Sequence, residues 1–290
     1  MDKCRIACVR YLNTVPLIEG LEKVQGVELI PTVPSRIAGM VRSGEAEVGL
    51  CSVVDGAKWP KGQMAKGPNE ELVMLPVGMI GCDGATLTVR VFSRVPMEKV
   101  REVHADTDSH TSVVLCRMVL EKLFGVRARV VDFDARERVE RASGKGPNCQ
   151  IAKSPNGEGE DVGWSAVGLD SAWPETVLLI GDKVVTDAPP ESRYPYQLDL
   201  GEAWKKLTGL PFVYAVWMCR GDRVGDPAVR AAMAALDRQR RHNAMRLDWI
   251  VAKHAPEHRW PVELARKYLG EYLKFDVGER EREAVGRFFS

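Results

Sequence analysis

Strand and helix patterns alternate over the first fifty residues, and this alternation constrains the fold more than any other feature of the chain. Residues 4–9, 27–32 and 47–51 have the apolar character of buried strands. Helices are predicted to begin near Pro16, where Asn13 or Thr14 supplies a cap, and at Pro34. A β-α-β-α-β order of this kind predicts a parallel sheet with right-handed crossovers.

A helix followed at once by a buried strand lies about three quarters of the way along the chain. Asp199 is a good N-cap, and Gly209 with Pro211 ends the helix at Thr208. Residues 212–218 then form a nearly continuous apolar run, typical of a strand buried on both faces. A buried strand here, before a helical C-terminus, is what a two-lobed α/β protein needs when its chain returns to the first lobe.

The rest of the pattern completes a two-lobed α/β organisation. Further strands are predicted at 72–80, 86–92, 100–105, 127–132 and 176–180, the second of them crossing into the other lobe. The C-terminus is predicted to hold one helix from Pro227 to about Lys253 and shorter helices at 261–274 and 278–289. Residues 143–172, rich in Gly, Ser and Pro, are interpreted as a surface excursion with little regular structure. We expect lobe 1 to comprise residues 1–84 and 219–290, and lobe 2 to comprise residues 85–218 with the hinge strands.

Composition excludes several classes of protein. A net charge of +1 over 290 residues, with scattered Lys and Arg, argues against a nucleic-acid partner. No apolar run reaches membrane length and no signal segment is visible, so we expect a cytoplasmic protein with no membrane partner. Seven cysteines without a Cys-x-x-Cys pair indicate reduced, mostly buried thiols, and the five histidines lack ligand spacing, so no metal site is expected.

Three turns place a helix N-terminus beyond the carboxyl end of a strand, where open α/β sheets bind ligands. They are residues 11–14, 108–112 and 181–182. Hydroxyl, amide and backbone N–H donors at such turns favour an anionic small molecule, although plain helix capping explains any one of them alone. His110 near Ser109 and Ser112 is a weak nucleophile–base pattern, and a solvated turn residue is the simpler interpretation. Asp182 is interpreted as a structural hydrogen-bond acceptor rather than a base.

Several segments together resemble the chorismate dehydratases of the futalosine route to menaquinone, a family with the two-lobed, type II periplasmic-binding-protein-like fold. The resemblance implies two mixed sheets flanked by helices, a two-strand hinge and a helical C-terminus. The most specific segments are Tyr-Leu-Asn-Thr-Val-Pro-Leu at 11–17 and Thr-Gly-Leu-Pro-Phe-Val-Tyr-Ala-Val-Trp at 208–217. The other matching segments are Pro-Ser-Arg at 34–36, residues 84–93, Asp-Ser-His-Thr-Ser at 108–112, Leu-Ile-Gly-Asp at 179–182 and residues 199–207.

Membership in this family implies elimination of water from chorismate to give 3-[(1-carboxyvinyl)oxy]benzoate, with no cofactor and no metal. The resemblance places Asn13 and Thr88 at the reacting centre. Thr88 stands where the family usually has Ser, and Cys-Ser-Val at 51–53 stands where a Pro-Ser pair is common. The substrate-binding residues predicted from the turns and the resemblance are Tyr11, Thr14, Ser35, Ser109, His110, Thr111 and Ser112. Chorismate is the expected small-molecule partner, and the oligomeric state stays open.

Two other functions are consistent with the same fold. The first is 1,4-dihydroxy-6-naphthoate synthase of the same pathway, which has a different N-terminal turn from the Tyr-Leu-Asn-Thr found at 11–14. The second is a non-catalytic, small-anion-binding protein of a transporter, a class that requires export, whereas no signal segment is visible.

Overall fold

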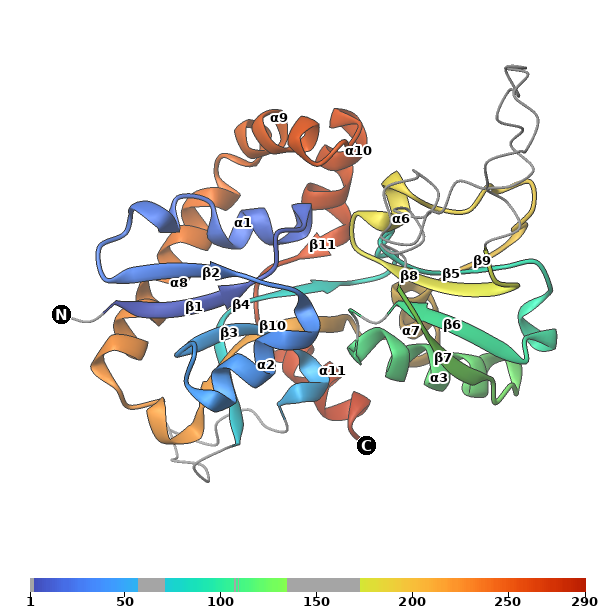
Figure 1. Cartoon of the computed structure of the whole chain (residues 1–290), viewed down its shortest axis with the longest axis horizontal. Helices are drawn as coiled ribbons and strands as arrows, with labels where there is room; N and C mark the ends of the chain where they lie inside the picture. Colours follow the sequence, from blue (N-terminus) through green and yellow to red (C-terminus); the bar gives the residue numbers. More distant parts are fainter. Residues whose placement is uncertain (1–2, 57–70, 107, 109, 135–172) are drawn as a thin grey trace, which may run out of the picture.

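The computed structural model describes residues 3–56, 71–106, 108, 110–134 and 173–290. Two mixed sheets lie side by side, each flanked by helices (Figure 1). The larger sheet has the order β11-β4-β10-β3-β1-β2 and comprises β1 (Cys4–Cys8), β2 (Val27–Pro31), β3 (Val48–Ser52), β4 (Leu72–Cys82), β10 (Phe212–Arg220) and β11 (Leu273–Lys274). The smaller sheet has the order β7-β6-β8-β5-β9 and comprises β5 (Val89–Ser93), β6 (Glu102–Asp106), β7 (Arg129–Phe133), β8 (Thr176–Ile180) and β9 (Tyr196–Asp199).

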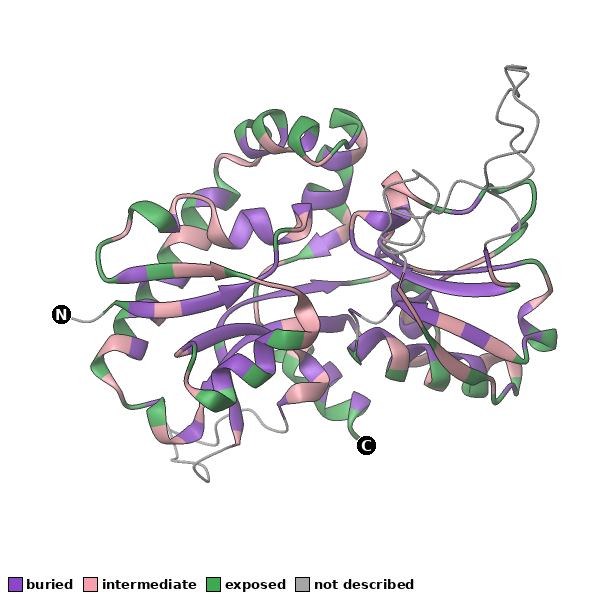
Figure 2. Cartoon of the chain, viewed as in Figure 1, coloured by how far each residue is buried: buried purple, intermediate pink, exposed green. Residues whose placement is uncertain are grey.

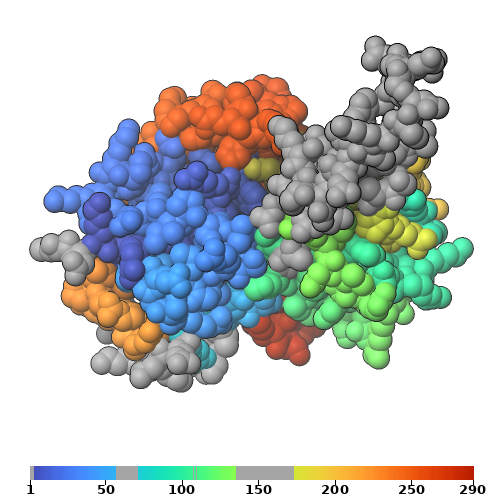
Figure 3. All heavy atoms as spheres, in the orientation of Figure 1, coloured from blue at the N-terminus to red at the C-terminus, as the bar shows by residue number. Residues whose placement is uncertain are grey.

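The helices cover both faces of the larger sheet and flank the smaller one (Figure 1). They are α1 (Val15–Ile18), α2 (Pro34–Ser43), α3 (His110–Phe124), α6 (Lys183–Thr186), α7 (Leu200–Thr208), α8 (Pro227–Ala244), α9 (Leu247–Glu257), α10 (Val262–Lys267) and α11 (Glu279–Phe288). A π-helical turn, η6 (Tyr268–Tyr272), continues α10. In the space-filling view the orange helices α9 and α10 lie over the top of the blue N-terminal region (Figure 3).

The predicted β-α-β-α-β unit is present. Strand β1 pairs in parallel with both β2 and β3, and β10 joins the same sheet antiparallel to β3 and β4. The fold is therefore a mixed α/β fold with two sheets, as predicted. Residues 143–172, the predicted excursion, lie outside the described residues.

The chain passes from the larger to the smaller sheet between Cys82 and Val89, and it returns between Asp199 and Phe212. The division of the chain into lobe 1, residues 1–84 and 219–290, and lobe 2, residues 85–218, remains a proposal. Because β10 pairs with β3 and β4, residues 212–218 belong to the larger sheet, although that division assigned them to lobe 2.

An aromatic cluster packs where the chain returns to the larger sheet. The ring centroid of Trp204 lies 5.3 Å from that of Phe212 and 5.8 Å from that of Phe288. The indole N–H of Trp204 donates to the carbonyl of Pro211 at 2.8 Å. These rings belong to a buried core that continues from one sheet into the other, visible as the purple strands of both lobes (Figure 2). The helix and strand at 199–217 thus join the two halves through their own packing.

The long helix predicted from Pro227 to about Lys253 is wrong, because the structure divides it into α8 and α9. The buried amide of Asn243 donates to the carbonyls of Pro16 and Glu19 and accepts from the guanidinium of Arg246. These contacts at the end of α8 with a distant turn stop the helix where sequence periodicity alone would continue it. Another difference is β11, which forms a short strand at the end of residues 261–274 where a helix was predicted.

The six described cysteines are free and buried, as predicted, and Cys149 lies outside the described residues. Burial raises the pKa of both Cys8 and Cys116 to about 12, so these thiols stay protonated and unreactive at neutral pH.

Gly201, in the first turn of α7, permits the helix to approach the connection that leaves β4. A Cβ atom at Gly201 would lie 2.1 Å from Thr86 Oγ1, 2.5 Å from Cys82 Sγ and 2.6 Å from the carbonyl of Gly84. Since one of these atoms is backbone and the others are buried, the neighbours cannot move away freely.

We expect Gly201→Ala to lower the free energy of unfolding by about 1–3 kcal/mol, the usual penalty for overpacking. Gly39→Ala is the matched control, because Gly39 is an exposed position of α2 where an added Cβ meets nothing within 4 Å. Its greater helix propensity should raise stability by about 0.5–1 kcal/mol. Urea unfolding of both variants measures the difference, and equal stabilities would contradict the packing argument.

Candidate active site

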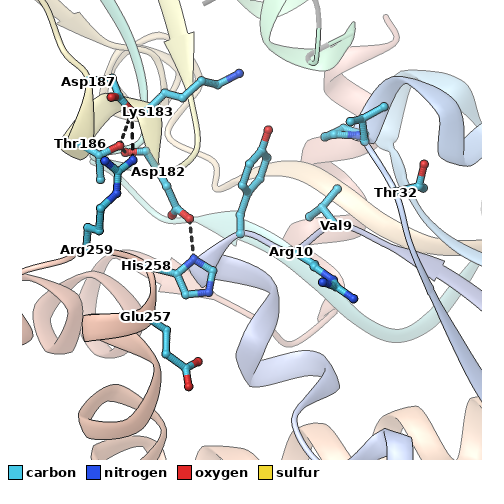
Figure 4. A pocket seen from close by; sticks show the side chains of 13 residues that line it. Val9, Arg10, Thr32, Asp182, Lys183, Thr186, Asp187, Glu257, His258 and Arg259 are labelled. Carbon is cyan, nitrogen blue, oxygen red and sulfur yellow. Dashed lines mark hydrogen bonds and ion pairs between the residues drawn. The ribbon is translucent and has the colours of Figure 1, made fainter. Parts of the chain in front are cut away.

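Two adjacent chambers lie between the sheets. The inner chamber has a volume of about 80 Å³ and is lined by Val9, Tyr11, Asn13, Pro34, Leu50, Ser52, Ile80, Thr86, Thr88, Val89, Asp108, Thr111, Ser112, Ile180, Gly181, Tyr214, Ala215, Tyr268 and Leu273. The outer chamber, of about 560 Å³, is lined by Val9, Arg10, Tyr11, Thr32, Val33, Pro34, Asp182, Lys183, Thr186, Asp187, Glu257, His258 and Arg259 (Figure 4). Val9, Tyr11 and Pro34 line both chambers, so the two are neighbours.

Asn13 and Thr88 both line the inner chamber, although they come from different parts of the fold. Asn13 follows β1 in a 3-10 turn, and Thr88 precedes β5 in the connection from the larger sheet. The phenol of Tyr268 lies 2.6 Å from Thr88 Oγ1 and lines the same chamber as Asn13. The two residues predicted to react with the substrate are thus brought together around a buried tyrosine.

Thr88 is held by a turn rather than by a strand, so the predicted strand at 86–92 begins three residues too early. The carboxylate of Asp199 accepts from the backbone N–H of Thr86 at 2.9 Å and of Leu87 at 2.7 Å. Leu87 has φ +71°, a left-handed conformation that is strained for a leucine. The same carboxylate caps α7 by accepting from Gly201 N at 3.0 Å. Asp199 therefore fixes the turn that presents Thr88 to the chamber.

The beginning of α3 contributes Thr111 and Ser112 to the inner chamber, together with the buried carboxylate of Asp108. Asp108 Oδ2 accepts from the phenol of Tyr11 and from Lys183 Nζ, both at 3.2 Å. Lys183 Nζ also lies 2.5 Å from Asp106 Oδ2, whose burial raises the pKa of that carboxyl. A buried lysine thus compensates two buried carboxylates beside the helix N-terminus that was predicted to bind an anion.

The other predicted binding residues have different positions. Thr14 is fully buried, and its hydroxyl donates to Asn13 Oδ1 at 3.2 Å. Ser35 lies in the first turn of α2 and lines neither chamber. His110 is exposed and its Nδ1 lies 3.1 Å from Asp55 Oδ1. Ser109 lies outside the described residues. Of the predicted set, Tyr11, Asn13, Thr88, Thr111 and Ser112 line the inner chamber.

Asp182 is a structural hydrogen-bond acceptor, as predicted. Its carboxylate accepts from the backbone N–H of Leu12 at 3.2 Å, from Trp260 Nε1 at 3.1 Å and from His258 Nδ1 at 2.8 Å (Figure 4). Leu12 belongs to the turn that carries Asn13, and Trp260 stacks on Tyr268 with ring centroids 4.8 Å apart. One carboxylate from the smaller sheet therefore holds both the first turn and the C-terminal helices in place.

Sequence reasoning assigned no role to several polar residues that line the inner chamber. Ser52, Thr86 and Tyr214 lie within segments singled out by the resemblance, and Tyr268 lies in residues 261–274, which were predicted only as a helix. Within the described ranges, no cluster of three or more His, Cys, Asp or Glu side chains is placed to hold a metal ion. In the same part of the chain, no helix has the length and hydrophobicity that a membrane crossing requires.

The sequence of this chain matches the family described as menaquinone biosynthesis over residues 4–149 and 166–290. The chain belongs to this family. A curated relative, the chorismate dehydratase of Thermus thermophilus, is 28% identical over 293 residues, which cover 96% of this chain and 91% of the relative. The family resemblance inferred from the sequence segments is therefore confirmed.

Solved structures agree on the fold of this menaquinone-biosynthesis protein. A crystal structure of an Archaeoglobus fulgidus protein has a TM-score of 0.63 at 14% identity and covers 99% of this chain and 95% of its own. The alkanesulfonate-binding protein of Xanthomonas axonopodis pv. citri, bound to MOPS, has a TM-score of 0.57 at 11% identity, with 99% and 90% covered. A Candida albicans protein with the generic periplasmic-binding-protein fold has a TM-score of 0.51 at 11% identity, with 95% and 82% covered. The predicted periplasmic-binding-protein-like fold is confirmed.

We expect Asp182→Asn to lower the free energy of unfolding by about 1–3 kcal/mol, because its amide group would turn an N–H toward donors that need an acceptor. Asp248→Asn is the control, since the Asp248 side chain is 86% exposed and pairs with Arg266 at the surface. That change should stay within about 0.5 kcal/mol of the parent protein. Denaturant unfolding measures the free energy of unfolding of both variants. An equal decrease in the two variants would contradict the structural role assigned to Asp182.

Proposed function

We propose that this protein is a chorismate dehydratase, a cofactor-free hydro-lyase that converts chorismate to 3-[(1-carboxyvinyl)oxy]benzoate. The observation that carries the proposal is the convergence of Asn13 and Thr88 in one enclosed chamber of a menaquinone-biosynthesis protein. The similarity to the chorismate dehydratase of Thermus thermophilus supports it. A cytoplasmic location and a small-molecule partner follow from the proposed reaction.

The proposed chemistry needs little from the protein. The bond between the ring carbon and its hydroxyl breaks, a neighbouring ring proton leaves, and water is released as the ring becomes aromatic. Because aromatisation drives the reaction, the protein has mainly to orient the substrate and to stabilise the departing hydroxyl. Asn13 and Thr88 hydrogen-bond near that hydroxyl. The substrate's own enolpyruvyl carboxylate accepts the ring proton.

Substrate entry requires the lobes to part. The inner chamber of about 80 Å³ is smaller than typical small-molecule pockets of roughly 300–1,000 Å³. Hydrogen bonds join the two halves beside it, including Tyr11 OH to Asp108 Oδ2 at 3.2 Å and Thr111 Oγ1 to the Tyr214 carbonyl at 3.1 Å. Opening breaks these bonds, and closure around the ring excludes water.

Chorismate carries two carboxylates, and the two chambers supply different groups for them. The inner chamber has no Lys or Arg among its lining residues, so one carboxylate is bound there by Ser112 and the backbone N–H groups at the beginning of α3. The outer chamber has Arg10, which is exposed and has no hydrogen bond or ion pair with any described residue, and Arg259, whose contact with Asp187 is long at 3.9 Å (Figure 4). The second carboxylate faces these guanidinium groups.

The purified protein is expected to convert chorismate to an aromatic product, followed by ultraviolet absorbance. Asn13→Ala and Thr88→Val should each lower kcat by roughly 10²- to 10³-fold, the usual effect of losing one hydrogen-bond donor at a reacting oxygen. Thr88→Ser keeps the hydroxyl and should retain activity. Unchanged turnover in Asn13→Ala and Thr88→Val would show that neither residue takes part in the reaction. Tight binding of chorismate by the parent protein without turnover would favour a binding protein instead.

Arg10→Gln is expected to raise KM for chorismate by about 2- to 5-fold at low ionic strength and to leave kcat unchanged, because an exposed charge interaction is worth about 0.2–1 kcal/mol. The increase should shrink as salt screens the charge. Arg127→Gln is the control, since Arg127 is 84% exposed and lines neither chamber. An Arg10 variant with the parent KM at every salt concentration would contradict the assignment.

A further inference from the structure

Two hydroxyl groups at the inner chamber form a short, buried hydrogen bond. Tyr268 OH lies 2.6 Å from Thr88 Oγ1. Thr88 and Tyr268 are each 1% exposed, so this bond is shielded from water.

The chemistry of the two groups gives this bond its direction. Burial raises the pKa of Tyr268 far above its ordinary value, so the phenol keeps its proton at neutral pH. Because a phenol is a better donor and a poorer acceptor than an aliphatic hydroxyl, Tyr268 OH donates to Thr88 Oγ1. Thr88 then has its own proton free for the chamber.

We propose that Tyr268 is a positioning residue of the reacting centre, which turns the Thr88 hydroxyl so that its proton points at the departing hydroxyl of the substrate. This inference rests on the proposed function. Without the Tyr268 bond the Thr88 hydroxyl rotates freely and donates to the substrate for only part of the time.

The local structure holds Tyr268 in this position. It begins the π-helical turn η6, an irregularity that is frequent at functional sites and that directs a side chain away from the regular helical path. Its ring stacks on Trp260 with an interplanar angle of 18°, and Trp260 is in turn held by Asp182. The C-terminal segment therefore contributes a polar side chain to the inner chamber, from residues 261–274 that were predicted only as a helix.

Tyr268→Phe is the direct test, because phenylalanine fills the same space and removes only the hydroxyl. Steady-state kinetics with chorismate should give a kcat lowered by about 10- to 100-fold and a KM within about twofold of the parent value, as expected for loss of orientation at the reacting group. Tyr194→Phe is the matched control. Tyr194 is also fully buried, its hydroxyl donates to the Pro174 carbonyl at 2.7 Å, and it lines neither chamber. Its kcat should equal that of the parent.

A double-mutant cycle with Thr88→Val separates positioning from a general structural role. If Tyr268 acts through the Thr88 hydroxyl, Tyr268→Phe will lower kcat by less than about twofold once that hydroxyl is absent. A full and additive loss in the Thr88→Val background, or a parent-like kcat in Tyr268→Phe alone, would overturn the inference. A parent protein that does not convert chorismate would instead refute the proposed function, so the two failures are distinct.

Discussion

The carboxylate of Asp182 is the interaction on which the arrangement of the site depends. It lies at the carboxyl end of β8 in the smaller sheet, and its three donors come from the turn after β1 and from the end of α9. A carboxylate with three directed donors in a partly buried setting is a strong constraint, because each donor loses a partner if the carboxylate moves. These bonds thereby fix the position of the two halves of the molecule relative to each other around the inner chamber.

A second carboxylate, that of Asp199, fixes the backbone on the other side of the site. It holds the backbone of Thr86 and Leu87 in a strained turn, and one of its oxygens, Oδ1, also caps the beginning of α7. The strain at Leu87 is offset by these bonds, and the result is a rigid presentation of Thr88. The inner chamber thus owes its geometry to two acidic side chains, of which Asp182 lines the outer chamber and Asp199 lines neither, and all polar residues that line the inner one except Asp108 are neutral.

The sequence was informative wherever local pattern and structure share a cause. The β-α-β-α-β unit, the cap at Asp199 and the buried strand after Pro211 all follow from apolar spacing and capping chemistry, and the structure contains them. Asn13 and Thr88 were found through the family resemblance. The break after Ala244, the turn at Leu87 and the position of Tyr268 depend on contacts between distant residues, such as Asn243 with Pro16 and Tyr268 with Thr88. No local pattern encodes such contacts.

The central claim is that the substrate ring lies between Asn13 and Thr88, with one carboxylate at the beginning of α3. A crystal structure of the protein with 3-[(1-carboxyvinyl)oxy]benzoate tests this most directly. We expect electron density for the aromatic ring in the inner chamber, within hydrogen-bond reach of the Asn13 and Thr88 side chains, and for a carboxylate beside Ser112. Density for the ligand in the outer chamber alone, or on another surface of the molecule, would contradict it.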